Sequence, residues 1–477
     1  MTRHVNRRDF LARAGQGALA LGALSYRAAD GAGSGPPKRR NVVMMVVDDQ
    51  GFQAGCYGDR VAVTPNLDAL AADGTRFTHG FCTSASCSAS RSVILSGLHN
   101  HANGQFGHQH SVHDFATHRW VQSLPVLLSR AGYRTCSIGK FHVQPEDVYR
   151  FDTRPNKGIP GGTRNPVAMA ERARSFIQED DKRPFFLYLC TSDPHRARKG
   201  FGNDRDYPGC KKRTFDAAKV PVPPWLPDYP ETRGELAEYY GAIYRVDQGL
   251  GRLMQVLKET GHWDDTLVMY LSDNGPPWPG AKTTVYEPGI HLPLVVRSPD
   301  QKRRGVATNA MVSWTDLAPT ILDYAGAKGP AKYKLHGRSF LPVLDVEKAE
   351  DWDTVYASHT FHEITMYYPM RVVRERRYKY ILNIAHQLPY PFASDLQASA
   401  TWQATLKRRA THFGKRSVEA YLHRPRHELY DLEADPHEAM NLASDPRHAA
   451  TLARLQRKLK AWQRATKDPW LVKYRYE

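Results

Sequence analysis

The sequence NVVMMVVDDQG, residues 41–51, joins an uninterrupted apolar run to a pair of aspartates, Asp48 and Asp49. An apolar run without alternating polar residues is typical of a strand that helices cover on both faces, as in a parallel sheet. Three later segments have the same design, a short apolar run followed at once by polar residues. They are YRTCSI (133–138), FFLYLC (185–190) and TLVMYL (266–271).

The polar residues behind these four runs are acids, cations and an amide. Ligands of open α/β sheets bind beyond the carboxyl ends of the strands, so we expect these residues to lie at one edge of the sheet. Four such coincidences make chance a poor explanation. The residues concerned are Asp48, Asp49, Lys140, His142, Asp193, His195, Arg196, Asp273 and Asn274.

The C-terminal part of the chain has a different pattern. Residues 376–384 (RRYKYILNI) and 427–442 predict an antiparallel module, and residues 446–467 predict a helix with an apolar face that includes Trp462. We therefore predict an α/β fold class. A large, mostly parallel sheet is sandwiched by helices, and a smaller C-terminal antiparallel α+β domain follows.

The N-terminus has the pattern of an export signal. Arg7 and Arg8 precede a modest apolar stretch, residues 14–24, that is too short to span a bilayer permanently. This arrangement predicts a twin-arginine signal, and hence export by the Tat translocase to the periplasm, the cell surface or the medium. The predicted parts of the chain are a signal peptide (1–29), a linker (30–40), a catalytic domain (41–370) and a C-terminal subdomain (371–477).

The composition narrows the class of partner. The chain has 477 residues and a formal net charge of +17, which suits nucleic acid, anionic lipid or an acidic polysaccharide; solvated surface charge alone is the alternative. No zinc-finger spacing, RNP-like motif or dense basic run favours nucleic acid. The six cysteines include no CxxC pair, which argues against a dense disulfide framework and leaves one or two bridges open.

Hard oxygen ligands follow the first and last of the four runs. Asp48, Asp49 and Asp273 would repel one another without a cation, and with Asn274 they form an oxygen-only set that favours Ca²⁺ or Mg²⁺ over zinc. Taken singly, the DD pair is explained by a strand-end cap and DNG by a tight turn. Together at strand ends they predict a metal site.

Cations accompany these acids. Lys140 and His142 end one buried run, His195 follows another, and Lys282 lies in the Gly/Pro-rich loop after Asp273. Cations around a divalent metal imply a ligand with anionic tetrahedral oxygens, sulfate or phosphate. We interpret the other histidines, those within residues 99–113, as loop or core polar residues.

The stretch FCTSASCSASRSVILSG, residues 81–97, contains the candidate nucleophile. A free cysteine is usually a small core hydrophobe. Cys87, however, enters a predicted helix one turn before Arg91. The helix N-terminus and this arginine would both direct positive potential at the same anion site.

Together these motifs resemble those of the sulfatase family. CSASR (87–91) matches the family's C-x-[PA]-x-R, and the family's GK-x-H, DPH and DNG follow in order; Cys82 lacks the downstream arginine because position 86 is Ser86. Within the family, three segments are similar to the sulfamidases, the N-sulfoglucosamine sulfohydrolases of heparan sulfate breakdown. They are SIGKFHVQPEDVYRFD (137–152), HEITMYYPMR (362–371) and HELYDLEADPHEAMNLASDPR (427–447).

The resemblance implies a mechanism and a cofactor. A sulfatase-maturating enzyme would convert Cys87 to formylglycine, whose hydrated aldehyde is the family's nucleophile. One Ca²⁺ would be held by Asp48, Asp49, Asp273, Asn274 and the modified Cys87.

The resemblance also implies roles for the surrounding side chains. Arg91 and the metal would stabilise the nucleophile, and His142 would take a proton from its second hydroxyl. His195 or Lys282 would protonate the departing nitrogen, and both, with Lys140, would neutralise the sulfuryl oxygens. The candidates for sugar recognition are Asp193, Arg196, His362 and Glu363.

Other functions remain open at this point. An O-sulfatase for another sulfated polysaccharide and a phosphonate or phosphodiester hydrolase of the same superfamily both suit the fold. A non-catalytic heparin-binding protein would suit the net charge. Residues 362–371 favour the sulfamidase interpretation, and Cys87 with Arg91 beside a full metal set argues against a protein without activity.

Overall fold

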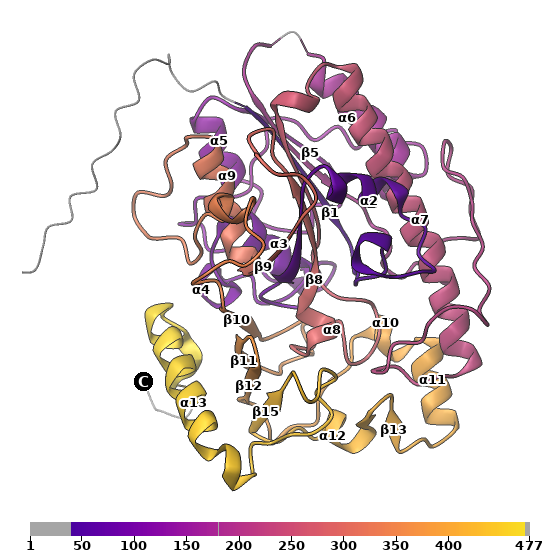
Figure 1. Cartoon of the computed structure of the whole chain (residues 1–477), viewed down its shortest axis with the longest axis vertical. Helices are drawn as coiled ribbons and strands as arrows, with labels where there is room; N and C mark the ends of the chain where they lie inside the picture. The colour runs from indigo at the N-terminus through magenta and orange to yellow at the C-terminus, as the bar shows by residue number, and fades with distance from the viewer. Residues whose placement is uncertain (1–39, 180, 473–477) are drawn as a thin grey trace, which may run out of the picture. The chain divides into compact units, whose positions relative to one another are not determined.

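The computed structural model describes residues 40–179 and 181–472, which belong to one compact unit. The predicted signal peptide and all but one residue of the predicted linker lie outside the described residues. The main sheet has seven strands (Figure 1). In spatial order they are β5 (Arg134–Gly139), β6 (Phe185–Cys190), β1 (Asn41–Val47), β7 (Thr266–Ser272), β8 (His291–Arg297), β2 (Thr75–Phe81) and β9 (Val306–Ser313).

The four apolar runs form the contiguous parallel part of this sheet. β5, β6, β1 and β7 pair in parallel as neighbours, and each lies within one residue of its predicted bounds. β8 is antiparallel to both of its neighbours, whereas β2 and β9 pair in parallel. The prediction of a large, mostly parallel sheet is confirmed.

Helices cover both faces of the sheet, as uninterrupted apolar strands require. Along β1, alternate residues contribute to two separate hydrophobic cores. One core includes α3 (Cys87–Ser96), α5 (Leu124–Arg130) and α9 (Leu317–Tyr324), and the other includes α2 (Pro65–Ala72), α6 (Pro166–Ile177) and α7 (Pro230–Glu259). Figure 1 shows the two helical layers on opposite sides of the strands.

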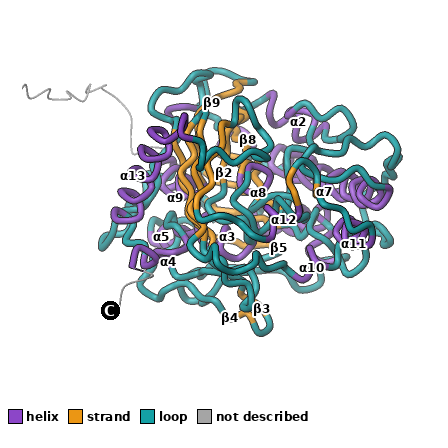
Figure 2. The backbone as a smooth tube through the Cα atoms, turned by 90° about the horizontal axis from the view of Figure 1, so that it is seen from below, coloured by secondary structure: helices purple, strands orange, loops and turns teal. Residues whose placement is uncertain are grey.

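A second, smaller sheet is antiparallel throughout, as predicted. Its strands are β10 (Thr354–His359), β11 (Met370–Glu375), β12 (Tyr378–Asn383) and β15 (His427–Asp431). Helix α13 (Ala449–Ala465) packs on it through Leu455, Leu459 and Trp462, and lies beside these strands in Figures 1 and 2. The predicted boundary at residue 370 falls between β10 and β11 of this one sheet.

The connection between β12 and β15 does not stay with the second sheet. It carries α10 (Ser394–Gln397), α11 (Ala400–Lys407), the hairpin of β13 (His412–Phe413) and β14 (Arg416–Ser417), and α12 (Val418–Leu422). Glu235 on α7 accepts hydrogen bonds from the backbone of Ala400 and Thr401. The excursion therefore docks on the catalytic part of the chain.

Three short elements of the described structure remain besides the 3-10 helices. They are α4 (Asn100–Asn103), α8 (Glu287–Ile290) and the hairpin of β3 (Gln109–His110) and β4 (His113–Asp114), which stands out at the lower edge of Figure 2. All six cysteines are free, so neither of the disulfides that the sequence left open is present. Across residues 40–179 and 181–472, no helix combines the length and apolar character needed to cross a membrane.

Candidate active site

The carboxyl ends of β1 and β7 bring the predicted metal ligands together. The two strands pair in parallel up to Val47 and Ser272, so Asp49 and Asp273 emerge side by side. The backbone N–H of Asp49 donates to Oδ1 of Asp273 at 3.1 Å, and Nδ2 of Asn274 donates to Oδ1 of Asp49 at 2.6 Å. One carboxylate oxygen from each of Asp48, Asp49 and Asp273 lies within 4.8 Å of the others.

Two buried oxygens of this group accept no hydrogen bond from the described residues: Oδ1 of Asp48 and Oδ1 of Asn274. Burial raises the pKa of Asp273 to about 7; the positive charge of Arg91 opposes the rise and the negative charge of Asp48 adds to it. The three carboxylates are thus not all ionised without further positive charge. Buried hard oxygens without hydrogen-bond donors fit a hard divalent cation.

Cys87 is the first residue of α3 and faces these acids. Its thiol donates to Oδ1 of Asp49 at 3.8 Å, and one turn on Nε of Arg91 donates to Oδ2 of Asp273 at 2.9 Å. Burial raises the pKa of the Cys87 thiol well above its ordinary value, although Lys140 opposes the rise. The unmodified thiol is therefore neutral and a poor nucleophile. Cys82 is also buried, but its thiol points to the carbonyl of Gly289.

Lys140 and Lys282 flank the aspartates. Nζ of Lys140 lies 2.5 Å from Oδ2 of Asp48, and Nζ of Lys282 lies 2.9 Å from Oδ2 of Asp49. Burial by itself would lower the pKa of each lysine. The adjacent carboxylates outweigh burial and raise both values, so both ammonium groups stay charged at neutral pH.

A tight turn sets the position of Lys140. Gly139, the last residue of β5, has φ +98°, and a Cβ atom there would lie 2.0 Å from the carbonyl oxygen of Cys190. Only glycine allows the chain to leave the sheet at this point. Two non-glycine residues of the site, Asp49 (φ 65°) and His142 (φ 60°), also have left-handed backbone conformations. Such strain is concentrated at functional sites.

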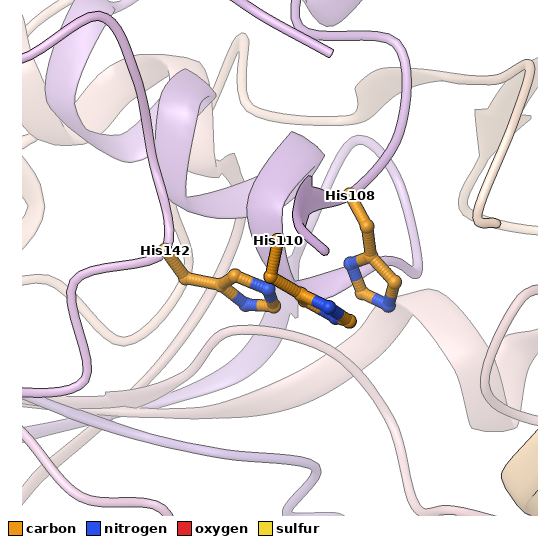
Figure 3. A group of neighbouring side chains, drawn as sticks. All are labelled: His108, His110 and His142. Carbon is orange, nitrogen blue, oxygen red and sulfur yellow. The ribbon is translucent and has the colours of Figure 1, made fainter. Parts of the chain in front are cut away.

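His142 lies beside Lys140 with both ring nitrogens buried and without a hydrogen-bond partner among the described residues. Its ring stacks on those of His108 and His110, each with a centroid distance of 4.9 Å (Figure 3). Burial, followed by the charge of Lys140, lowers the pKa of His142 well below its ordinary value. A neutral imidazole with free nitrogens is suited to accept a proton.

The three stacked histidines do not form a ready metal site, although their nitrogens lie within 4.8 Å of one another. The planes of His108 and His110 lie at 26° and 20° to that of His142. Lone pairs lie in the ring planes, so nearly parallel rings do not direct them to one point. Nε2 of His108 also lies 2.8 Å from Nε2 of His362, whose Nδ1 bonds Oγ of Ser86. The stack supports the His142 ring.

This finding corrects the interpretation of part of the 99–113 segment. His99 and His101 are core residues that pack against Trp462, as expected. His108 and His110 instead contact His142 and belong to the surroundings of the site. Nothing in the sequence distinguishes His108 and His110 from His99 and His101, because their surroundings depend on where the β3–β4 hairpin packs.

Two protein-family models match the chain. Residues 40–327 match the family model described as sulfatase. The chain belongs to the sulfatase family. Residues 280–397 match a second model, described as the C-terminal part of N-sulphoglucosamine sulphohydrolase.

Two relatives span most of this sulfatase. The N-sulphoglucosamine sulphohydrolase of Homo sapiens is 40% identical over 462 residues, which cover 91% of this chain and 91% of that protein. An ulvan-active sulfatase of Formosa agariphila is 29% identical over 440 residues, which cover 90% of this chain and 81% of that protein. The similarity to sulfatase enzymes therefore extends over nearly the whole chain.

Solved structures agree on the fold. A protein in complex with its substrate D-glucosamine-2-N,6-O-disulfate superposes with a TM-score of 0.66 at 22% identity, over 91% of this chain and 99% of that one. The phosphonate monoester hydrolase of Agrobacterium radiobacter superposes with a TM-score of 0.65 at 20% identity, over 90% and 96%. At these identities the likeness concerns the fold alone.

The sulfatase site is partly open to solvent. Lys140 is 16% exposed and His195 is 26% exposed, whereas Arg91 and Lys282 are at most 1% exposed. A cavity of about 590 Å³ is lined by Asp48, Lys140, Arg164, His195 and Arg196, among others. A larger cavity of about 960 Å³, beside Trp462, is lined by none of the predicted site residues.

The four candidates for sugar recognition divide into two pairs. Asp193 is fully buried, and its two oxygens are taken by Arg164 and Arg245. His362 is 2% exposed and bonded on both sides. Asp193 and His362 therefore support loops rather than face the cavity, and we do not propose them as sugar contacts.

The other pair lies nearer to solvent. Arg196 lines the cavity and is held there by a bidentate ion pair with Glu235. Glu363 is half-buried, and its Oε1 accepts hydrogen bonds from the backbone N–H and hydroxyl of Ser394. Of the four candidates, only Arg196 therefore has hydrogen-bond donors at the cavity. Glu363 instead holds the start of α10.

One carboxylate of this sulfatase was not predicted from the sequence. Oδ2 of Asp395 on α10 lies 2.9 Å from Nζ of Lys282 and 3.9 Å from Nε2 of His195. Asp395 is 22% exposed. No local pattern marks it, because it reaches the site from the excursion between β12 and β15.

Proposed function

We propose that this sulfatase removes the N-sulfo group of terminal N-sulfoglucosamine in heparin and heparan sulfate. The observation that carries the proposal is the match of residues 280–397 to the N-sulphoglucosamine sulphohydrolase model. That range contains Lys282, which contacts the catalytic aspartates, and Asp395 and Glu363 from the module that closes the site. The net charge of +17 suits a substrate that carries further anions.

The nucleophile of the proposal is formylglycine made from Cys87 by a sulfatase-maturating enzyme. The neutral, buried thiol supports a need for this modification, and the arginine one turn on supports the choice of Cys87 over Cys82. When present, the hydrated aldehyde supplies an attacking oxygen. Arg91 is fixed by Asp273 within the same group of charges and would hold that oxygen in its ionised form.

The cofactor of the proposal is one Ca²⁺. Asp48, Asp49, Asp273 and Asn274 supply the hard oxygens, and position 87 adds a further one after modification. The cation would bind the hard oxygens that the protein leaves without hydrogen-bond donors. The unpartnered oxygens of Asp48 and Asn274 support this assignment.

The side chains around the cluster supply charge neutralisation and proton transfer. Lys140 and Lys282 stay charged and neutralise the sulfuryl oxygens. His142 is neutral and can accept a proton from the second hydroxyl at position 87. Nδ1–H of His195 donates to the carbonyl of Arg196, so Nε2 accepts a hydrogen bond from Nζ of Lys282 at 3.0 Å. We therefore assign protonation of the leaving nitrogen to the Lys282 ammonium, which His195 orients.

Two measurements test the nucleophile. Peptide mass spectrometry of protein from its own host should find formylglycine at position 87 and unmodified cysteine at position 82. Cys87→Ala should abolish sulfate release, whereas Cys82→Ala should retain it. Full activity of the Cys87 variant would refute the mechanism.

Bond preference needs a matched pair of heparan-derived saccharides. One carries an N-sulfo group on the terminal glucosamine, and the other an N-acetyl group with a 6-O-sulfate. We expect faster sulfate release from the first. Faster release from the second would favour an O-sulfatase, and hydrolysis of a phosphonate monoester in preference to both would favour the other hydrolase of the superfamily.

For localisation we propose export of the folded enzyme by the Tat translocase to the periplasm or beyond. Arg7 and Arg8 ahead of a weakly apolar stretch support this route. Replacing both by lysine should leave the precursor in the cytoplasm, as cell fractionation would show. Unchanged export of the double variant would contradict the assignment.

A further inference from the structure

We propose that Asp395 is a specificity-determining residue that selects nitrogen over oxygen as the leaving atom. This inference rests on the proposed function and names the group that would contact the sulfamate nitrogen. Three observations carry it: the place of Asp395 beside the proposed proton donor, its partly exposed side chain, and one carboxylate oxygen without a partner.

The contacts place Asp395 on the leaving-group side of the site. Oδ2 is 2.9 Å from Nζ of Lys282 and 3.9 Å from Nε2 of His195. Lys282 in turn contacts Asp49 at 2.9 Å, so the chain of contacts runs from the predicted metal ligands through Lys282 to Asp395. The nucleophile belongs at the metal end, and the leaving atom at the other.

One oxygen of Asp395 is not used by the protein. Oδ1 is buried and has no hydrogen-bond partner within the described part of the chain. An ionised carboxylate can accept about four hydrogen bonds, so an unsatisfied buried oxygen costs free energy unless a ligand supplies a donor. If Asp395 served only to hold Lys282, Oδ2 would suffice and Asp49 already shares that task.

The position of Asp395 is fixed by its neighbours. The preceding residue, Ser394, donates from both its N–H and its hydroxyl to Oε1 of Glu363. α11, which follows, is tied to Glu235 on α7 through Ala400 and Thr401. The carboxylate is therefore held on both sides, as discrimination between similar ligands requires.

A sulfamate differs from a sulfate ester at one atom. Its bridging nitrogen carries a hydrogen that an ester oxygen lacks, and its product is an amine that is protonated in neutral water, whereas an ester yields a neutral alcohol. Oδ1 of Asp395 can accept the N–H hydrogen, and its negative charge stabilises the ammonium product. An ester oxygen would leave Oδ1 unpaired and would face its negative charge.

The bond changes balance without a further reactant. Sulfur forms a bond to the attacking oxygen at position 87 while the S–N bond breaks and its electron pair stays with nitrogen. Nitrogen takes a proton from Nζ of Lys282, which regains one from water, and keeps its own hydrogen, which stays hydrogen-bonded to Oδ1 of Asp395. The resulting amine then takes a proton from water, and the charge of Asp395 holds the ammonium until release.

The first test compares two leaving groups in the full-length, modified enzyme. Asp395→Asn keeps the size of the side chain but removes its charge, and Glu419→Gln, an exposed change on α12, is the matched control for net charge. For N-sulfoglucosamine we expect kcat/KM of Asp395→Asn to fall about 100-fold. For an aryl sulfate, whose leaving group needs neither N–H recognition nor protonation, the fall should be about 5-fold or less. Equal losses on both substrates would overturn the proposal and leave Asp395 a support for Lys282.

The second test does not depend on turnover. Calorimetry on Cys87→Ser protein would measure binding of glucosamine, which carries the ammonium, and of N-acetylglucosamine, which does not. Asp395→Asn should weaken glucosamine binding about tenfold and change N-acetylglucosamine binding by less than about twofold. Equal effects on both sugars would overturn the proposal. Failure of the wild type to cleave N-sulfoglucosamine, with glucosamine binding still dependent on Asp395, would refute the proposed function but not the contact.

Discussion

Two groups of fully buried charges differ in how their hydrogen-bonding capacity is met. The first is the cluster of Asp48, Asp49 and Asp273 with Arg91 and Lys282 at the carboxyl edge of the main sheet. The second is a single ion pair, Arg371 on β11 with Asp468 after α13, in which both side chains are 0% exposed.

Every side-chain nitrogen of Arg371 and both carboxylate oxygens of Asp468 have a hydrogen-bond partner. Nε and Nη2 of Arg371 donate to the two oxygens of Asp468 at 2.6 and 2.9 Å, and Nη1 donates to the carbonyl of His359. Asp468 also accepts from Nε2 of Gln463 and the N–H of Trp470. It ties the C-terminal segment to the second sheet and leaves no atom for a ligand.

The edge cluster has the opposite character. In and beside it, Oδ1 of Asp48, Oδ1 of Asn274, Oδ1 of Asp395 and both nitrogens of His142 have no hydrogen-bond partner among the described residues. Burial raises the pKa of Asp273, while that of Asp468 is lowered to about 2, because the hydrogen bonds and charge of Arg371 outweigh burial. Buried charge by itself therefore does not mark an active site. Several unsatisfied buried polar atoms gathered at one edge of the sheet do.

The largest expected effect comes from changing the cluster. Asp273→Asn changes a proposed metal ligand, so we expect kcat for sulfate release to fall about 1,000-fold or more. Without Ca²⁺, the free energy of unfolding should change by only about 1 kcal/mol, because the lost charge was itself disfavoured by burial. Sulfate release and urea unfolding measure the two effects, with the exposed Asp323→Asn as control. Strong destabilisation with retained kcat would show the cluster to be structural.

The ion pair should respond in the reverse way. Asp468→Ala leaves Arg371 buried without its partner, which we expect to lower the free energy of unfolding by about 3–5 kcal/mol. At temperatures where the variant is folded, kcat should stay within about twofold of the wild type, since no site residue contacts Asp468. Paired thermal-unfolding and activity measurements would check this. A loss of kcat as large as that of Asp273→Asn would erase the distinction between the two regions.

Calcium should stabilise only one of the two regions. A ligand that binds the folded state at about 100 times its Kd adds about 2.7 kcal/mol, so Ca²⁺ should raise the Tm of chelator-treated wild type and of Asp468→Asn. It should not raise the Tm of Asp273→Asn. Differential scanning calorimetry with Ca²⁺, Mg²⁺ and Zn²⁺ would measure this. Stabilisation and reactivation by zinc alone would contradict the oxygen-ligand assignment.

The smallest effect is a pH dependence of stability. The folded pKa of Asp468 is about 2 and its unfolded value is near 3.9, so the folded state favours the ionised form. Its contribution, on the order of 2 kcal/mol, is complete above about pH 4 and is lost as pH falls through about 2. Urea titrations from pH 6 to 2.5 should show a steeper decline for the wild type than for Asp468→Asn. Parallel curves would show that Asp468 does not contribute to acid unfolding.

Much of the fold and the meeting of the candidate site residues could be predicted from the sequence alone. An apolar run such as residues 41–47 specifies a strand buried on both faces, and the residue at its carboxyl end is then placed by the chain itself. Asp49, Lys140, His195 and Asp273 all follow from this local rule, because neighbouring parallel strands end at the same edge. The C-x-A-x-R pattern likewise makes Cys87 rather than Cys82 the proposed nucleophile without any knowledge of packing.

Only the tertiary structure decided which polar residues have partners. Asp193 follows a strand as the ligands do, yet Arg164 and Arg245 from distant segments consume its carboxylate. His108 and Asp395 carry no pattern in the sequence, but a packed hairpin and the excursion after β12 bring them to the site. The physical reason is that a strand end is positioned by local hydrophobic periodicity, whereas the satisfaction of a buried polar atom depends on chain segments that meet only in the folded state.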